Sequence, residues 1–315
     1  MRKGPSFSQA VKEELCLEEL SSPVRDKSLL SAFIRINGSL VFRDKITYLV
    51  LSSENAKIAK LIYSKIKEYF DCDVKLSFIN NFKKKTSFVI TIGEGSEKVI
   101  EELEVSFLEG KISKNLVKND EMISGYLAGA FLACGSINSP LTSNYHMELA
   151  LNSENYAKWL IHLFNRYSGT SIEPKLIQRR DKTVLYIKKS QQIADFLALI
   201  GATGSLMEFE NIRIERDFKN SENRLENSDL ANMKKIFETA QKQIKEIKFI
   251  DEKLGIKNIQ SSKQQALCHL RLNNETASMQ ELANLLSEQL KTPITKSNVN
   301  HLFRSLHELY VRLSS

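Results

Sequence analysis

Polar and basic side chains that can contact a nucleic acid gather near the C-terminus. They follow the helix-breaking segment Lys291-Thr292-Pro293-Ile294, and they are Thr295, Lys296, Ser297, Asn298, Asn300, His301 and Arg304. Lysine and arginine neutralise phosphates, and asparagine offers the paired donor and acceptor that can read adenine. On one helix these residues would lie within about three turns, so a single groove could receive them all. The chemistry that they predict is recognition of double-stranded DNA.

The surrounding pattern predicts three helices that would position this surface. Apolar spacing marks them at residues 262–272, 278–290 and 295–313. Their inner faces are Met279, Leu282, Ala283, Leu285 and Leu286 on the second helix, and Val299, Leu302, Phe303 and Leu306 on the third. The polar residues then face outward at the start of the third helix, where a recognition helix meets base edges. A helical hairpin that binds only protein is the open alternative.

A second set of candidate contacts lies in a polar stretch upstream. It consists of Arg213, Arg216, Lys219, Asn223, Arg224, Asn227 and Asn232, with acidic residues interspersed. Residues 211–227 show little apolar periodicity, which indicates a linker or arm, and a helix is predicted from Leu230 to about Ile250 behind a Ser228-Asp229 cap. Because the charges nearly balance, both a DNA or interdomain contact and a solvated linker fit this segment.

Two stretches in the first part of the chain share one layout. Leu127 to Ser136 sets small residues among large apolar ones and ends in Gly-Ser, and Leu30 to Ser39 does the same 97 positions earlier. Further matches join Ile46–Leu51 to His146–Leu151, Ser53–Asn55 to Ser153–Asn155, and Lys85–Thr86 to Lys182–Thr183. We infer that a unit of roughly a hundred residues occurs twice.

Small residues in both stretches predict two helices that pack closely, since helix separation depends on the side chains at the crossing. The packing residues are Ala32, Gly38, Ala128, Gly129 and Gly135, with Gly129 expected opposite Ala32. Each unit shows the order helix, two strands, helix, two strands, helix, which indicates an α+β domain with one antiparallel sheet per repeat. Equivalent hairpin turns carry Lys83-Lys84-Lys85 and Arg179-Arg180, which fit either DNA contacts or ordinary solvated turns.

Composition and charge limit the classes to which this protein can belong. The chain has 315 residues, a net charge of +7, 42% hydrophobic residues and 26% charged residues, which suits a globular protein of two or three domains with an anionic partner. Its four cysteines form no CxxC pair, so free thiols in a reducing cytosol are expected. Without a signal peptide or a long apolar run, we expect a cytoplasmic, nucleoid-associated protein with no membrane partner.

The paired helices resemble the LAGLIDADG motif of homing endonucleases, and the repeated αββαββα order agrees with that fold. The resemblance implies a pseudo-two-fold domain in which an acidic residue at the foot of each motif helix holds a divalent metal. Here these positions carry Asn37 and Cys134, which do not offer the anionic oxygen ligands that magnesium prefers. We therefore expect no catalytic residues, no metal and no cofactor.

The chain as a whole resembles the WhiA family of bacterial regulators. The resemblance rests on Tyr126–Pro140, Ile193–Leu197 with Ile200–Ala202, Phe209–Arg213, Asn223–Asn227 with Ala231-Asn232, and Pro293–Ser297 with Val299–His301. It implies a degenerate LAGLIDADG-like domain over residues 1–210, with repeats of about 1–110 and 111–210. A charged linker and long helix over 211–254 and an all-α helix-turn-helix domain over 255–315 would follow.

The family implies a non-enzymatic transcriptional regulator that binds double-stranded DNA and acts in cell division and chromosome segregation, and in sporulation in relatives. Other transcription or division proteins are further expected partners, and the sequence sets no oligomeric state. Two alternatives differ in class. One is a scaffold whose repeat domain binds protein or a small ligand, and the other is an active LAGLIDADG endonuclease, which Asn37 and Cys134 argue against.

Overall fold

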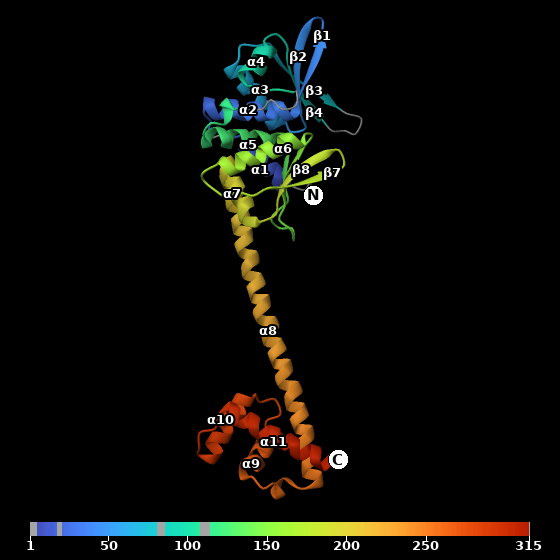
Figure 1. The fold of residues 1–315 in the computed structure, drawn as a ribbon, viewed down its shortest axis with the longest axis vertical. Coiled ribbons are helices and arrows are strands. Elements are labelled where there is room, and N and C mark those ends of the chain that lie inside the picture. The colour runs from blue at the N-terminus through green and yellow to red at the C-terminus, as the bar shows by residue number, and fades with distance from the viewer. Residues whose placement is uncertain (1–4, 18–20, 81–85, 108–113, 315) are drawn as a thin grey trace. The chain divides into compact units, whose positions relative to one another are not determined.

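The computed structural model describes residues 5–17, 21–80, 86–107 and 114–314 (Figure 1). The chain divides into two compact units, Met1–Arg216 and Asp217–Ser315. Within the described residues, no helix combines the length and the apolar character needed to cross a membrane.

The first repeat of the first unit contains one four-stranded antiparallel sheet. Its strands are β1 (Gly38–Arg43), β2 (Ile46–Ser53), β3 (Val74–Asn80) and β4 (Thr86–Ile92), in the order β1-β2-β4-β3. Its helices are α1 (Phe7–Leu15), α2 (Pro23–Asn37), α3 (Ala56–Tyr69) and α4 (Ser96–Glu102). Residues Leu49, Leu51, Ile90 and Ile92 of the central strands are buried beneath the helices.

The second repeat has the same topology. Its strands β5 (Gly135–Ile137), β6 (Met147–Leu151), β7 (Lys175–Arg179) and β8 (Lys182–Ile187) pair in the order β5-β6-β8-β7. Its helical elements are η1 (Asn115–Val117), α5 (Asp120–Cys134), α6 (Glu154–Arg166) and α7 (Ser190–Ile200). The predicted α+β fold with one sheet per repeat is confirmed.

The register of the strands corrects the predicted alignment of the repeats. Gly38 pairs with Leu51 in the first repeat, and Gly135 pairs with Leu149 in the second, so Leu51 corresponds to Leu149 rather than to Leu151. The helix caps agree, because Asn55 caps α3 where Ser153 caps α6. Side chains alternate with a period of two along a strand, so an alignment shifted by two residues preserves the apolar pattern and escapes notice.

Local sequence signals set where α2 begins. Pro23 is its first residue, because proline lacks the N–H that a first helical turn leaves unpaired. The hydroxyl of Ser22 caps this helix by accepting from Arg25 N at 3.2 Å.

The motif helices α2 and α5 lie side by side (Figure 1) and approach closely along one face of α5. A Cβ atom on Gly129 would lie 2.2 Å from the carbonyl oxygen of Leu29, and one on Gly125 would lie 2.3 Å from that of Arg25. The backbone that faces Gly129 is therefore that of Leu29 rather than Ala32. Residues four apart share a helix face, which is why Gly125 and Gly129 act together although the sequence singled out only Gly129.

The other predicted packing residues are also placed at or beside this helix pair. Ala32 and Ala128 are fully buried. Gly38 and Gly135 stand where each helix passes directly into a strand. A Cβ on Gly38 would lie 2.4 Å from Ile34 O, and one on Gly135 would lie 2.1 Å from the Phe131 ring. Both glycines therefore permit a helix-to-strand transition with no intervening loop.

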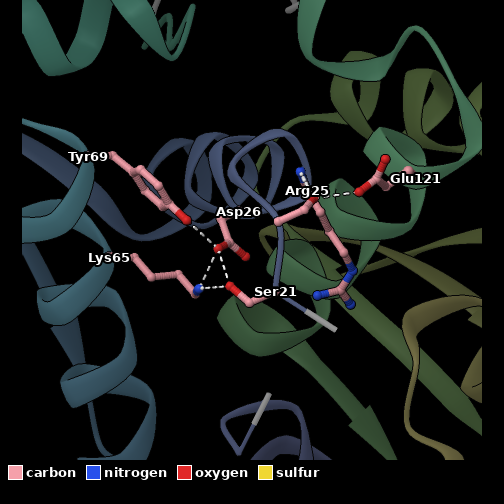
Figure 2. Close-up of polar contacts among 7 residues, drawn as sticks. Ser21, Arg25, Asp26, Lys65, Tyr69 and Glu121 are labelled. Atoms are coloured by element: carbon pink, nitrogen blue, oxygen red, sulfur yellow. Dashed lines mark hydrogen bonds and ion pairs between the residues drawn. The ribbon is translucent and has the colours of Figure 1, made fainter. Parts of the chain in front are cut away.

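A buried polar cluster ties α2 to α3 (Figure 2). Its centre is Asp26 Oδ2, which accepts from Lys65 Nζ at 2.6 Å, Tyr69 Oη at 2.7 Å and Ser21 Oγ at 2.6 Å. The side chains of Asp26 and Lys65 are 0% and 5% exposed. Burial and the bond to the Asp26 carboxylate raise the pKa of Tyr69 well above its usual value. A buried ion pair thus joins α2 to α3 in the first repeat.

The second unit contains α8 (Thr203–Lys253) from Asp217 onward, together with η2 (Ile256–Asn258), α9 (Ser262–Asn273), α10 (Met279–Leu290) and α11 (Lys296–Ser314). The prediction of a linker over residues 211–227 is wrong, because this stretch is helical throughout. It is polar, yet it contains no glycine or proline, so nothing in it interrupts a helix. Ser228 and Asp229 accordingly cap no helix.

The core of the second unit joins α8 to the three shorter helices. Ile247 and Ile250 of α8 are buried with Leu267, Leu286 and Phe303. Of the predicted inner face of α10, Leu282, Ala283 and Leu286 are buried, while Met279 and Leu285 are half-buried. This core holds α10 and α11 as a helix-turn-helix pair.

Candidate nucleic-acid interface

The turn between α10 and α11 sets the direction of the candidate recognition helix. Lys291 ends α10 in the left-handed conformation, with φ 51°. The Ser287 hydroxyl accepts from Ile294 N at 2.9 Å and donates to Ala283 O at 2.7 Å, which joins the end of the turn to α10. Val299, Phe303 and Leu306 then bury one side of α11.

Every residue of the predicted contact set at the start of α11 is exposed: Thr295, Lys296, Ser297, Asn298, Asn300, His301 and Arg304. Lys296, Asn300 and Arg304 are spaced by four and form one stripe along the helix, with Ser297 and His301 beside it. Neither Lys296 nor Arg304 forms an ion pair with a described residue. The stripe thus presents two cations that flank an amide.

Thr295 and Asn298 differ from the other members of this set because they are hydrogen-bonded to each other. The Thr295 hydroxyl accepts from Asn298 N at 3.3 Å, and Asn298 Oδ1 accepts from Thr295 N at 3.0 Å and from Thr295 Oγ1 at 2.6 Å. This reciprocal pair caps the N-terminus of α11. Because the Asn298 carbonyl oxygen serves the cap, Asn298 is poorly placed to read adenine. Asn300 makes no hydrogen bond to described residues through its side chain, so its amide is the better candidate for base recognition.

Two arginines of the α8 set are already engaged within the first unit. Arg213 pairs with Glu210 at 2.8 Å and donates to Gln191 Oε1 at 2.9 Å. Arg216 donates to the carbonyl oxygens of Pro140, Thr142 and Ser143 at 3.1, 2.8 and 3.2 Å, and its guanidinium lies 4.7 Å from the centroid of the Tyr145 ring. These bonds tie the first part of α8 to the second repeat, so a structural role accounts for both arginines.

The remaining members of that set, Lys219, Asn223, Arg224, Asn227 and Asn232, are exposed. Lys219, Asn223 and Asn227 recur every fourth residue and share one face of α8, with Arg224 next to it, whereas Asn232 lies on the opposite side. Lys219 and Arg224 form no ion pair with any residue that the structure describes. One polar face of α8 is therefore suited to phosphate contacts.

The basic hairpin turns offer fewer candidate DNA contacts than their sequence suggests. Lys83-Lys84-Lys85 lies outside the described residues. Arg179 pairs with Glu148 Oε2 at 3.0 Å, which also lies 2.9 Å from His146 Nε2. Arg180 occupies the left-handed region with φ 55° at the turn itself. Only Arg180 of this pair is left pointing into solvent without a described acidic partner.

Asn37 and Cys134, the feet of the motif helices, line the same pocket of 430 Å³. Asn37 Nδ2 lies 3.5 Å from Ser52 O, and Cys134 Sγ donates to Ala130 O at 3.4 Å. Burial raises the pKa of Cys134 to about 12, so its thiol is neutral at physiological pH. No group of three or more His, Cys, Asp or Glu side chains among the described residues is arranged to hold a metal ion. These donors do not fit magnesium, which prefers carboxylate oxygens.

Family models match most of the chain in three segments. The model of the WhiA N-terminal LAGLIDADG-like domain matches residues 24–106, that of the WhiA LAGLIDADG-like domain matches 123–219, and that of the WhiA C-terminal HTH domain matches 223–310. The "probable cell division protein WhiA" of Staphylococcus aureus strain USA300 is 35% identical over 312 residues, and 96% of each chain is covered. The protein of that name in strain JH9 is 35% identical over 309 residues, again with 96% of each chain covered.

Solved structures support the fold. Full-length DUF199/WhiA from Thermatoga maritima superposes with a TM-score of 0.59 at 24% identity, and the match covers 98% of this chain and 99% of that one. The N-terminal LAGLIDADG domain of DUF199/WhiA gives a TM-score of 0.50 at 22% identity over 64% of this chain and 92% of that one. With its two LAGLIDADG-like repeats and its C-terminal helix-turn-helix domain, this chain belongs to the WhiA family.

Proposed function

We propose that this protein is a non-enzymatic, DNA-binding transcriptional regulator that acts in cell division and chromosome segregation. The observation that carries the proposal is the exposed stripe Lys296, Asn300 and Arg304 at the start of α11. This helix lies in the region that matches the model of the WhiA C-terminal HTH domain. A recognition helix presents its N-terminal residues to the major groove, and this stripe combines phosphate-binding and base-reading groups. The role in cell division is transferred from the printed name of the Staphylococcus aureus relatives.

The decisive measurement is a fluorescence titration of double-stranded DNA with the full-length protein at several salt concentrations. Changing Lys296 and Arg304 together to alanine should weaken binding to all sequences. It should also reduce the slope of log K against log salt by about two, since each lost phosphate contact releases about one counterion fewer. Lys257→Ala with Lys263→Ala removes the same charge from exposed positions of the same unit and serves as the matched control. If both pairs leave the slope unchanged, α11 is not the DNA-binding helix.

Base reading separates the two asparagines. Asn300→Ala should relax the preference at one base pair by about 1–3 kcal/mol, the value of a good bidentate contact. Asn298→Ala should instead lower the stability of the second unit by about 1 kcal/mol, because it removes half of the α11 cap. If Asn298→Ala were to change sequence preference while leaving stability intact, the assignment of the two roles would be reversed.

The absence of nuclease activity is a separate part of the proposal. It rests on Asn37 and Cys134, which stand at the positions where the resemblance to LAGLIDADG endonucleases implies metal-binding carboxylates. A supercoiled plasmid incubated with high protein concentrations and magnesium or manganese should stay supercoiled. Specific nicking that disappears in Asn37→Ala or Cys134→Ala would contradict this expectation.

A scaffold that binds a protein partner is the second candidate function, and strand β1 is the observation that favours it. Leu40, Val41 and Phe42 on this edge strand are all exposed. An apolar edge strand is a surface on which another chain can add a strand. A full-length protein with Phe42→Lys that loses its regulatory effect while retaining DNA affinity would support this second function.

A further inference from the structure

The pocket at the feet of α2 and α5 has cationic walls. Its described lining residues come from both repeats: Arg35, Ile36, Asn37, Ser106, Phe107, Ala133, Cys134, Ala150, Leu151, Asn152, Ser153, Tyr156 and Lys182. Arg35 and Lys182 are the charged members of this described set, which includes no aspartate or glutamate. The described lining of this pocket therefore carries positive charge.

A second lysine, Lys12 of α1, acts electrostatically on Cys134, which lines the pocket. Its Nζ lies 5.6 Å from the centroid of the Phe131 ring. Burial lowers the pKa of Lys12, while the nearby Cys134 and Cys16 thiols act in the opposite direction. Lys12 and Lys182 are likewise the two charges that act on the Cys134 thiol, against its burial. Cys134 thus lies within the field of two lysines.

Arg35 is held in a fixed orientation at the pocket. Its Nη1 donates to Ser106 O at 2.8 Å, and its guanidinium carbon lies 4.6 Å from the centroid of the Tyr156 ring. A guanidinium has five N–H donors arranged as a fork that matches phosphate. Ser153 begins α6 at the same wall, and the N-terminal end of that helix adds partial positive charge.

We propose that this pocket binds a small phosphorylated molecule of nucleotide size. Arg35 and Lys182 would hold the phosphate, and Ile36, Phe107 and Leu151 would receive the apolar or aromatic body. A volume of 430 Å³ lies within the range of small-molecule sites, and such sites combine apolar walls with a few placed polar groups. The inference goes beyond the proposed function, since it concerns the first unit and makes no use of α11.

The test measures thermal unfolding of the full-length protein with AMP, inorganic phosphate or adenosine, followed by the fluorescence of Trp159. This is the single tryptophan of the chain, and its ring stacks on that of Tyr156, a residue of the pocket lining, with 5.8 Å between the centroids. AMP should raise Tm progressively with its concentration, inorganic phosphate should do so more weakly, and adenosine should have no effect. The proposal is wrong if AMP leaves Tm unchanged, or if adenosine raises Tm as much as AMP does. The cations would then serve only to balance the partial negative charge at the C-terminal ends of α2 and α5.

Variants locate the site. Lys182→Gln should weaken AMP binding at least roughly tenfold, the loss expected for one charged hydrogen bond. Lys175→Gln on the neighbouring strand β7 removes an exposed lysine outside the pocket and should leave binding unchanged. Equal AMP affinity in the Lys182 and Lys175 variants would overturn the proposal even if AMP stabilises the protein.

Two further measurements distinguish this site from the DNA-binding surface. Lys296→Gln with Arg304→Gln should retain the AMP response. If that variant loses the response instead, AMP binds α11, which contradicts the proposed pocket but leaves the DNA-binding function standing. Lys182→Gln should leave DNA affinity at a fixed salt concentration equal to that of Lys175→Gln. A selective loss of DNA affinity would assign the pocket to a backbone phosphate of DNA and would also overturn the proposal.

Discussion

The two repeats of the first unit share a topology but differ in what protects the edge of each sheet. Strand β1 spans Gly38–Arg43 and is exposed along most of its length, with Phe42 76% exposed. Strand β5 spans only Gly135–Ile137, and Ile137 N donates to the hydroxyl of Ser8 just beyond its outer edge, at 3.3 Å. Helix α1 therefore covers the second edge, and no described residue does the same for the first. A duplicated fold can thus keep its strand order while its edges acquire different roles.

The repeats also differ in the chemistry that joins the motif helix to the next helix. With the helix ends and caps aligned, Asp26 corresponds to Ile123 and Lys65 corresponds to Leu163. Ile123 and Leu163 are each 1% exposed, so an apolar pair replaces a buried ion pair. The same backbone arrangement accepts either solution, because a buried charge pair with good geometry offsets much of its own desolvation.

The largest expected effect comes from breaking this ion pair. Lys65→Met would leave the Asp26 carboxylate buried without its cation, with the hydroxyls of Ser21 and Tyr69 still donating to it. It should lower the free energy of unfolding of the first unit by about 3–5 kcal/mol. Denaturant titration of the full-length protein followed by Trp159 fluorescence measures this, since Trp159 lies in the first unit. The control is Asp26→Ile with Lys65→Leu, which copies the second repeat and should cost far less. If both variants lose the same stability, the repeats are not interchangeable here.

The helix crossing gives the next largest effect. Gly129→Ala would place a methyl group against the Leu29 carbonyl, and it should cost about 1–3 kcal/mol through overpacking. Ala32→Gly at the matching position of the first repeat should cost about 0.5–1 kcal/mol, the usual effect of glycine within a helix. The same fluorescence titration compares them. An unchanged midpoint for Gly129→Ala would show that the helices are farther apart than described.

A smaller effect concerns the tyrosine pair of the second repeat. Tyr126 Oη lies 3.0 Å from Tyr156 Oη, and burial raises the pKa of Tyr126 to about 12. The folded state therefore favours the neutral phenol, so this contribution to stability is complete below pH 10 and is lost as pH rises through about 12. Tyr126→Phe should cost about 1 kcal/mol at pH 7, and it should make stability fall less steeply between pH 10 and 12.

Denaturant titrations at a series of alkaline pH values test this prediction. The pKa of Tyr69 in the first repeat is also raised, so Tyr69→Phe should reduce the same slope independently. If the Tyr126→Phe and original proteins have parallel profiles above pH 10, ionisation of Tyr126 does not limit alkaline stability.

The smallest effect is expected at the exposed edge. Phe42→Ala on β1 should change the free energy of unfolding by less than about 0.5 kcal/mol, as is usual for exposed side chains. Ile137→Ala on β5 is the comparison at the covered edge and should cost about 2 kcal/mol or more, because this side chain is buried. A loss above about 1 kcal/mol for Phe42→Ala would mean that the first edge is also covered in solution.

Local patterns were sufficient for much of this protein. Apolar periodicity predicted the helices and strands of both repeats, and it predicted which side chains of α11 face outward, because these properties depend on neighbours within a few residues. The matched Gly-Ser stretches revealed the duplication, and the wider resemblance indicated the family. The polar stretch before Leu230 misled the same reasoning, since a helix needs no apolar stripe where its sequence contains nothing that breaks it.

By itself, then, the sequence determined the order of elements, the repeat and the exposed face of α11. Only the tertiary structure decided that Leu29 faces Gly129 and that Asp26 pairs with Lys65. It likewise decided that Arg216 donates to backbone carbonyl groups more than seventy residues earlier in the chain, such as that of Thr142. It also decided the two-residue shift between the repeats and the meeting of Arg35 with Lys182 in one pocket. The physical reason is common to all of these: each depends on the distance between residues remote in sequence, which packing sets and periodicity does not encode.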